Sequence, residues 1–122
     1  METMDAIKAL GALAQETRLA IFRLLVQAGP AGRAAGAIGE KLGIPPATLS
    51  FHLAQLAGSR LIHSRQEGRF VYYAADFGAM NALVGFLTEN CCGGAACGPA
   101  ACQPATTKGK DHEALPRARR RA

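Results

Sequence analysis

Four cysteines stand within twelve residues towards the end of the 122-residue chain: Cys91, Cys92, Cys97 and Cys102. Glycines and alanines separate them, so the backbone between them can fold back and bring three or four thiolates onto one ion. Thiolates are soft ligands that select thiophilic ions. No histidine or carboxylate stands between Cys91 and Cys102, which argues against a site for a hard ion.

The spacing of these cysteines narrows the choice of ion. Structural zinc sites commonly use C-x2-C pairs, in which both sulfurs reach one tetrahedral ion without strain. An adjacent pair such as Cys91-Cys92 with a third thiol fits a pyramidal three-sulfur ion better, and trivalent arsenic is the leading candidate. An incidental cluster is a weaker explanation, because the rest of the chain contains no cysteine.

An enzyme built on these thiols is not expected. Thiol-based reductases and phosphatases need an activated thiolate in a phosphate-cradling loop, typically C-x5-R. The residues six positions after the four cysteines are Cys97, Gly98, Gln103 and Lys108, none of which is arginine. The chain also has no apolar run of about 18 residues and no basic leader. We therefore expect a cytoplasmic protein, without a membrane partner, whose thiols are kept reduced.

The net charge of +5 is unevenly distributed. Residues 1–90 hold eight Lys and Arg against seven Asp and Glu, whereas residues 91–122 hold six against two. We expect residues 93–122 to form a flexible, cysteine-containing basic tail. Such a tail could add salt-sensitive, sequence-independent affinity for DNA.

The elements that must position any site are predicted to be short helices and one hairpin. Apolar periodicity predicts helices at residues 5–14, 19–28, 34–42, 46–57 and 77–90, and strands at 61–66 and 69–74. Gly43 is the expected C-cap of the third helix, and Glu67-Gly68 is the expected hairpin connection. Two helices joined by a tight turn and followed by a hairpin predict a winged helix-turn-helix, mainly α with a small β-hairpin wing, over residues 1–92.

The helix at residues 46–57 is the expected reader of DNA. Its leucines share one face and should pack inward, whereas the outer face is small, polar or flat and has no acidic residue. Gln55 could pair with adenine, and Phe51 could contact a thymine methyl group or instead pack on a neighbouring helix. Arg65 and Arg69 flank the hairpin tip and could reach phosphate. The candidate DNA-binding residues are Thr48, Ser50, Phe51, His52, Gln55, Arg65 and Arg69.

The first and last helices carry apolar stripes that predict a homodimer. In the last helix the stripe contains Met80, Leu83, Val84 and Leu87, and Cys91 would prolong it if that helix continued. A two-fold dimer would place two reading helices about 34 Å apart on a palindromic operator. A ligand that closes the loop onto Cys91 and Cys92 would then alter how two subunits meet and lower the operator affinity.

Three segments resemble the ArsR/SmtB family of metal-responsive repressors. They read LAQETRLAIFRLL at 13–25, TLSFHLAQL at 48–56 and EGRFVYY at 67–73. The resemblance implies a homodimeric winged-helix repressor that releases double-stranded operator DNA when it binds a metal or metalloid.

Two metal sites of that family have no counterpart here. The helix before the reading helix contains no cysteine, unlike that of many arsenic-responsive members. The last helix contains no histidine, unlike that of zinc-sensing members. The cysteines instead look like the subgroup whose arsenite site is a Cys-Cys pair after the last helix plus a later cysteine. The resemblance thus implies Cys91 and Cys92 as ligands, with Cys97 as the third and Cys102 as the other candidate.

The sequence is compatible with several inducers and several functions. The inducer could be As(III) as arsenite, antimonite or methylarsenite, and a methylated arsenical needs only two thiolates. A zinc or cadmium sensor, a thiol-redox sensor and an architectural DNA-binding protein are the competing functions. The last of these would leave the cysteines unexplained. No organic cofactor is expected.

Overall fold

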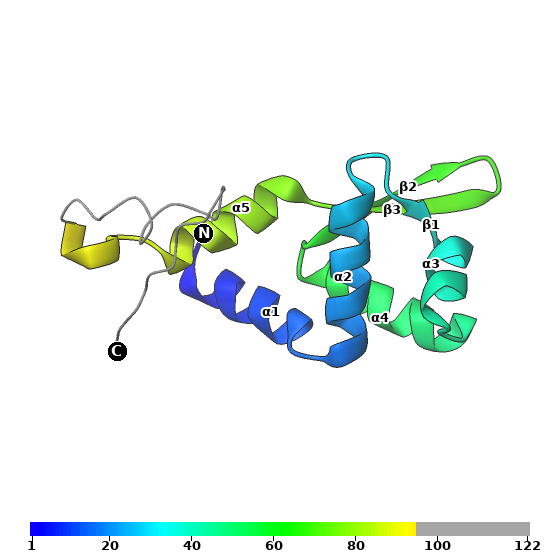
Figure 1. The fold of residues 1–122 in the computed structure, drawn as a ribbon, viewed down its shortest axis with the longest axis horizontal. Helices are drawn as coiled ribbons and strands as arrows, with labels where there is room; N and C mark the ends of the chain where they lie inside the picture. Colours follow the sequence, from blue (N-terminus) through cyan, green and yellow to red (C-terminus); the bar gives the residue numbers. More distant parts are fainter. Residues whose placement is uncertain (95–122) are drawn as a thin grey trace, which may run out of the picture. The chain divides into compact units, whose positions relative to one another are not determined.

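The structure is a computed structural model, and it describes residues 1–94 (Figure 1). Its chain divides into two compact units, Met1–Leu87 and a second one that begins at Thr88. The elements in order are α1 (Thr3–Leu13), α2 (Glu16–Ala28), β1 (Arg33–Ala34), α3 (Ala35–Leu42), α4 (Pro46–Gly58), β2 (Ile62–Glu67), β3 (Phe70–Ala75), α5 (Phe77–Leu87) and the 3-10 turn η1 (Cys91–Gly94).

Local sequence explains where the helices of the first unit begin and end. The Gln15 side chain accepts a hydrogen bond from the Arg18 N–H at 2.9 Å, so α2 begins at Glu16. Gly43 ends α3 in the left-handed conformation with φ +68°, as predicted. The Asp76 carboxylate accepts from the Ala79 N–H at 2.9 Å and caps α5. The predicted mainly α fold with a hairpin wing is confirmed.

Helix α2 passes through the middle of the first unit, between α1, α4 and the sheet (Figure 1). Its Ile21 and Leu25 side chains are completely buried. Leu56 from α4 and Leu61, which precedes β2, complete this centre. The core therefore joins the reading helix to the hairpin, which fixes their relative placement.

The sheet has three strands in the order β1-β3-β2, all antiparallel. The hairpin register runs from Ile62 opposite Ala75 to Glu67 opposite Phe70, so the two-residue connection is Gly68-Arg69. The predicted connection, Glu67-Gly68, is wrong by one residue. The reason is that Gly68 has φ +62°, and a two-residue loop that begins with such a glycine matches the type II′ hairpin turn.

Strand β1 is absent from the prediction because two residues carry no alternation pattern. The preceding Gly32 shows why the strand forms there. Gly32 has φ +72°, and a Cβ at this position would stand 2.2 Å from the carbonyl oxygen of Tyr73. Only glycine permits this approach, which brings Arg33 opposite Tyr73 on β3.

Helix α5 ends at Leu87, earlier than the predicted end at Asn90. Asn90 and Cys92 adopt φ +55° and +59°, outside right-handed helical geometry. Cys91 therefore does not prolong the apolar stripe of α5, which corrects that expectation. The first compact unit ends at Leu87, and the domain boundary at residue 92 stays a prediction. Most of the predicted tail, together with Cys97 and Cys102, lies outside the described residues.

Candidate functional site

Helix α4 divides cleanly into an inner and an outer face. Leu49, Leu53 and Leu56 are buried, as predicted. The exposed residues are Pro46, Ala47, Thr48, Ser50, Phe51, Ala54, Gln55, Ala57 and Gly58. No charged residue stands between Pro46 and Gly58. The outer face thus carries no charge and consists mostly of small side chains. Such a face can approach the base edges of a major groove closely.

Phe51 is the largest side chain on this outer face. It is 58% exposed, so within the described protomer it does not pack into a neighbouring helix, and that alternative is not supported. Its ring meets the ring of His52 edge-on, with 5.6 Å between centroids and 65° between planes. An exposed aromatic held by its neighbour is arranged for contact with another molecule.

The structure places His52 differently from the other candidate residues of α4. Its side chain is buried, at 9% exposure, and its Nδ1 lies 3.4 Å from the Nη1 of Arg18. His52 therefore faces α2 from behind the outer surface, while Thr48, Ser50 and Gln55 remain open. A direct DNA contact through His52 stays a prediction, and a supporting position is what the geometry shows.

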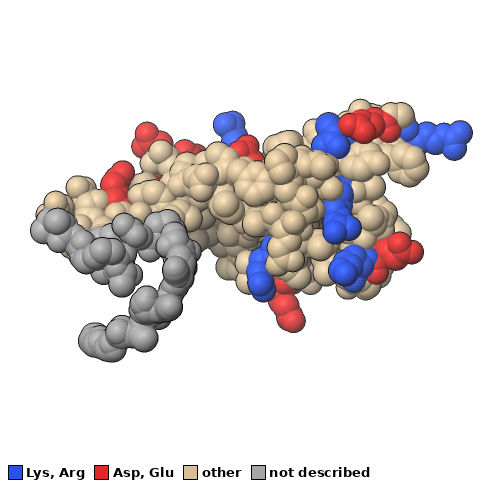
Figure 2. Space-filling view, turned by 45° about the horizontal axis from the view of Figure 1, so that its top comes forward, with Lys and Arg blue, Asp and Glu red and all other residues tan. Residues whose placement is uncertain are grey.

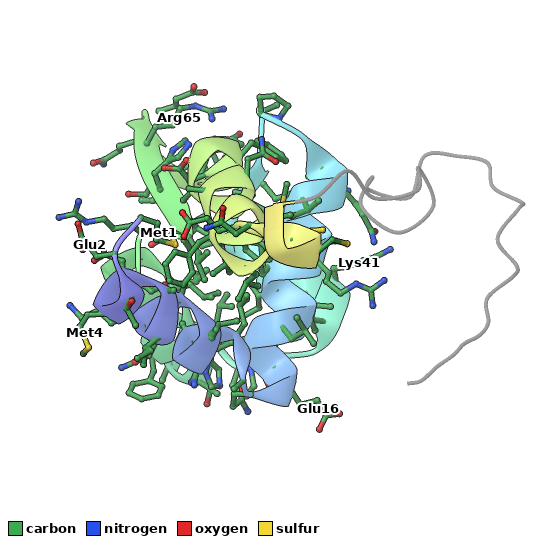
Figure 3. All side chains as sticks on the ribbon, turned by 90° about the vertical axis from the view of Figure 1, so that its left-hand side faces the viewer. Met1, Glu2, Met4, Glu16, Lys41 and Arg65 are labelled. Carbon is green, nitrogen blue, oxygen red and sulfur yellow. The ribbon has the colours of Figure 1, made fainter. Side chains whose placement is uncertain are left out.

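The wing brings both predicted arginines to one end of the first unit. Figure 2 shows blue and red side chains together there, and Figure 3 labels Arg65 on the hairpin. Arg65 pairs with Glu67 at 2.6 Å and lies over the ring of Tyr72, its cross-strand partner, at 5.0 Å. Arg69 is exposed in the tight turn and has no ion pair among residues 1–94. Arg69 is thus the better placed of the two for a phosphate.

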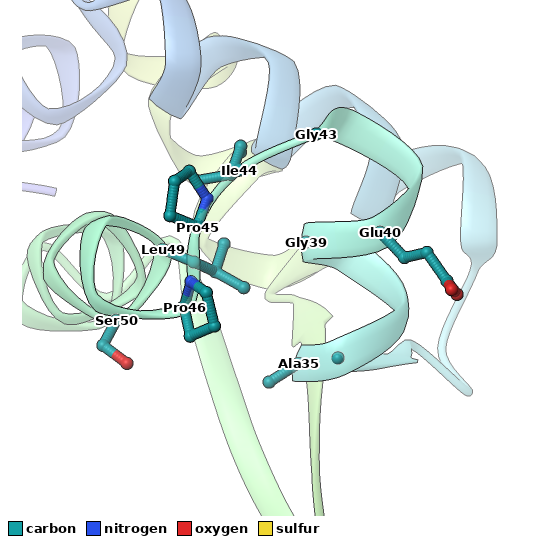
Figure 4. A pocket seen from close by; sticks show the side chains of 10 residues that line it. Ala35, Gly39, Glu40, Gly43, Ile44, Pro45, Pro46, Leu49 and Ser50 are labelled. Carbon is teal, nitrogen blue, oxygen red and sulfur yellow. The ribbon is translucent and has the colours of Figure 1, made fainter.

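Two hollows flank α4. One, about 470 Å³, separates α3 from α4 and is lined by Pro46, Leu49 and Ser50 on the α4 side (Figure 4). A Cβ at Gly39 would stand 3.1 Å from the Ile44 carbonyl oxygen, so glycine allows the two helices to approach. The other hollow, about 390 Å³, is lined by Gln55 together with Lys8 and Arg18. Ser50 and Gln55 therefore lie on opposite edges of the reading helix.

Helices α1 and α5 contact each other and leave apolar side chains uncovered. The exposed ones are Met4 at 65%, Ile7 at 54%, Leu10 at 41%, Val84 at 51% and Leu87 at 57%. Figure 3 shows Met4 pointing away from the unit. We call these five residues the apolar helix surface. By contrast, Leu83 of the predicted α5 stripe is buried in the core. No helix in residues 1–94 is long and apolar enough to cross a membrane.

In the second unit, the Cys91 and Cys92 sulfurs lie 3.7 Å apart. Cys91 is half-buried, and Cys92 is disulfide-bonded. The positive φ of Cys92 turns the backbone between them, which helps adjacent side chains converge. Within residues 1–94 no group of three His, Cys, Asp or Glu side chains comes together. If Cys92 were reduced, the pair could supply two sulfur donors, and a third would have to come from elsewhere.

The sequence reasoning missed Arg18, which touches both α1 and α4. A signal for it was present. A cation in the first turn of a helix faces the positive end of the helix dipole, which is slightly unfavourable and draws attention to its other contacts.

Comparison with known proteins identifies the family. Residues 13–65 match a helix-turn-helix domain family. The nodulation protein NolR of Rhizobium meliloti is 31% identical over 80 residues, which cover 66% of this chain and 63% of that relative. The alignment thus spans less than two thirds of the curated relative's length.

Two solved structures extend the comparison. An ArsR-like transcriptional regulator from Rhodococcus sp. RHA1 has a TM-score of 0.62 and 26% identity, covering 69% of this chain and 76% of that one. The homodimeric winged helix-turn-helix DNA-binding domain Mb0332 of Mycobacterium bovis, described as a possible ArsR-family regulator, has a TM-score of 0.56 and 31% identity. That match covers 70% of this chain and 80% of that domain. On this fold, sequence and coverage, the chain belongs to the ArsR family of winged helix-turn-helix transcriptional regulators.

Proposed function

We propose that this protein is a transcriptional repressor that binds a palindromic operator as a homodimer and releases it when trivalent arsenic binds its cysteine thiolates. The observation that carries the DNA-binding part is the neutral, exposed outer face of α4 beside the open Arg69 of the wing. A major groove about 12 Å wide admits such a helix, and the wing arginine adds a sequence-independent phosphate contact.

The apolar helix surface supports the homodimer. Five large apolar side chains on two contacting helices are more than 40% exposed. A second copy of the same surface is a complementary partner under two-fold symmetry. The two reading helices of such a dimer enter successive major grooves on the same face of the DNA. The two half-sites are then related by two-fold symmetry, so the operator is palindromic.

The adjacent sulfurs of Cys91 and Cys92 support the arsenic site. Sulfurs 3.7 Å apart can both contact one ion at about 2.3 Å, the usual distance for zinc and thiolate. Trivalent arsenic needs a third sulfur from Cys97 or Cys102, and it needs Cys92 as a thiolate. Methylarsenite would need only the pair, and antimonite would use the same three sulfurs.

One observation favours a second candidate function, a thiol-redox sensor. Cys92 is disulfide-bonded, and a cysteine that forms a disulfide can be oxidised and reduced reversibly. In that case oxidation of the thiols, and not ligation of arsenic, would alter operator affinity.

An operator-release assay separates these candidates. A duplex selected from a random pool by the reduced protein serves as the operator, and its release is measured with arsenite, methylarsenite, antimonite, zinc and hydrogen peroxide. Arsenite should release the duplex from the wild type and should protect three thiols from alkylation, whereas zinc should protect four. Cys92→Ser should abolish release by arsenite.

The variants Cys97→Ser and Cys102→Ser act as matched controls for each other. If Cys97 is the third ligand, Cys97→Ser should lose the arsenite response while Cys102→Ser keeps it. Release by peroxide alone would favour the redox sensor. Failure of the reduced protein to select any duplex would contradict the DNA-binding function itself.

A further inference from the structure

Arg18 occupies an unusual place for a cation. It stands in the first turn of α2, which begins at Glu16, so the unpaired N–H groups and the helix dipole oppose its charge. Among the described residues it has no ion pair with a carboxylate. Its guanidinium lies partly buried. Helix formation alone does not favour an arginine here.

The guanidinium joins the end of α1 to the reading helix. Its Nε donates to the Ala12 carbonyl oxygen at 2.6 Å, and its Nη1 lies 3.4 Å from the Nδ1 of His52. Ala12 is in the last turn of α1, where carbonyls lack partners within the helix and a cation is favourable. One side chain of α2 thus caps α1 and contacts α4 at the same time.

This contact bears on the tautomer of His52. Arginine has donors and no acceptor, so the contact is a hydrogen bond when His52 Nδ1 accepts, which corresponds to the tautomer with hydrogen on Nε2. The ring is buried and stands edge-on against Phe51. A chain of contacts therefore runs from the end of α1 through Arg18 and His52 to the aromatic side chain on the outer face of α4.

We propose that Arg18 is a positioning residue for DNA reading: it holds His52, and through it Phe51, at a fixed place relative to the end of α1. This inference rests on the proposed operator binding by α4. It also supplies a route between two surfaces. Helix α1 carries part of the apolar helix surface, so a change in how two copies meet at α1 is passed to Phe51 by a planar, two-ended side chain.

The test compares Arg18→Gln with Arg23→Gln, which removes the same charge from an exposed position of α2. Operator affinity should fall roughly tenfold for Arg18→Gln and less than twofold for Arg23→Gln. The slope of log affinity against log salt should stay unchanged for Arg18→Gln. Loss of a direct phosphate contact, as expected for Arg69→Ala, should reduce that slope by about 0.9.

A second variant and a spectroscopic readout keep the proposal testable if Arg18→Gln folds poorly. Arg18→Lys keeps the charge but lacks the planar fork, and it should also weaken the operator complex. Long-range proton–nitrogen NMR should show His52 as the Nε2–H tautomer in the wild type and as a tautomer mixture in Arg18→Gln, because the glutamine amide can either donate or accept.

Wild-type affinity and an unchanged His52 tautomer in both Arg18 variants would overturn the proposal. A reduced salt slope in Arg18→Gln would also overturn it, because Arg18 would then touch DNA directly. If the wild-type protein bound no duplex, the proposed function would fail, and the NMR comparison would still report separately on the contact between Arg18 and His52.

Discussion

Helices α1 and α4 both carry large apolar side chains at helical spacing, but α4 buries its leucines whereas α1 buries its alanines and exposes its large side chains. In α4 the leucines form the inner face: Leu49, Leu53 and Leu56. In α1 the inner face consists of alanines, and the large side chains point outward: Ala6, Ala9 and Ala12 inside, Met4, Ile7 and Leu10 outside. The leucines of α4 thus belong to the core of the protomer. The outward side chains of α1 form a surface that another molecule can cover.

The difference follows from how closely each helix must approach its neighbours. Alanine faces let two helix backbones come close, because no long side chain separates them. Arg18 can therefore bridge from α2 to the Ala12 carbonyl oxygen. The large side chains of α1 then gain their burial, worth about 1.5–3 kcal/mol each when complete, only from a partner. Periodicity shows that a helix has an apolar side, but it does not show which molecule covers that side.

The largest expected effect is on the inner face of α4. Leu53→Ala removes a side chain that is 2% exposed, so we expect it to lower the free energy of unfolding by about 2–5 kcal/mol. Leu53→Met keeps the volume and should cost less than about 1.5 kcal/mol. Urea denaturation monitored by circular dichroism measures both variants. A cost below about 1 kcal/mol for Leu53→Ala would mean that the two helices do not differ as described.

The next effect concerns the outer face of α1. Ile7→Glu places a charge where a second copy would bury an apolar side chain, so the dimer dissociation constant should rise at least about 100-fold. The protomer fold should survive, because Ile7 is 54% exposed. Ile7→Val is the control and should remain dimeric. Sedimentation equilibrium gives the answer, and an undisturbed dimer in Ile7→Glu would show that α1 faces water or a different partner.

Sequence patterns predicted most of the fold because its signals are local. Proline at the start of α4, Gly43 after α3 and Asp76 before α5 act within one helical turn. One error occurred where a distant contact decides. Strand β1 exists because Gly32 approaches Tyr73, forty-one positions later in the chain. The shift of the hairpin turn by one residue has a local cause instead, because Gly68 with φ +62° begins the turn and Glu67 pairs with Phe70.

The candidate site also contains residues that local sequence predicts and residues whose placement depends on contacts with other elements. The exposed residues of α4 were predictable from a helical wheel, because its leucines all lie on one face and that face packs into the core. The burial of His52 was not, since it depends on Arg18, which approaches from another helix. The sequence offers no reason to distinguish Arg65 from Arg69. Only the structure shows that Arg65 forms an ion pair with Glu67 and lies over the ring of Tyr72. For the cysteines, Cys97 and Cys102 lie outside the described residues, so their role stays a prediction.

The smallest expected effect tests whether exposed apolar side chains on α1 and α4 have different partners. Phe51 is about as exposed as Ile7, but its neighbours on α4 are small and neutral. Phe51→Ala should leave dimerisation unchanged and alter unfolding by less than about 0.5 kcal/mol. Operator affinity should fall by about tenfold, in line with the loss of one base contact.

The partner of Phe51 can be identified by changing the DNA as well as the protein. Replacing operator thymines with uracils removes the C5-methyl groups and leaves every hydrogen-bonding group in place. If Phe51 contacts such a methyl group, the replacement should weaken the wild type and should cost Phe51→Ala nothing further. Phe70→Ala removes another exposed phenylalanine, on the wing, and should keep the sensitivity to uracil. Equal sensitivity in wild type and Phe51→Ala, measured by fluorescence anisotropy, would show that Phe51 does not read methyl groups.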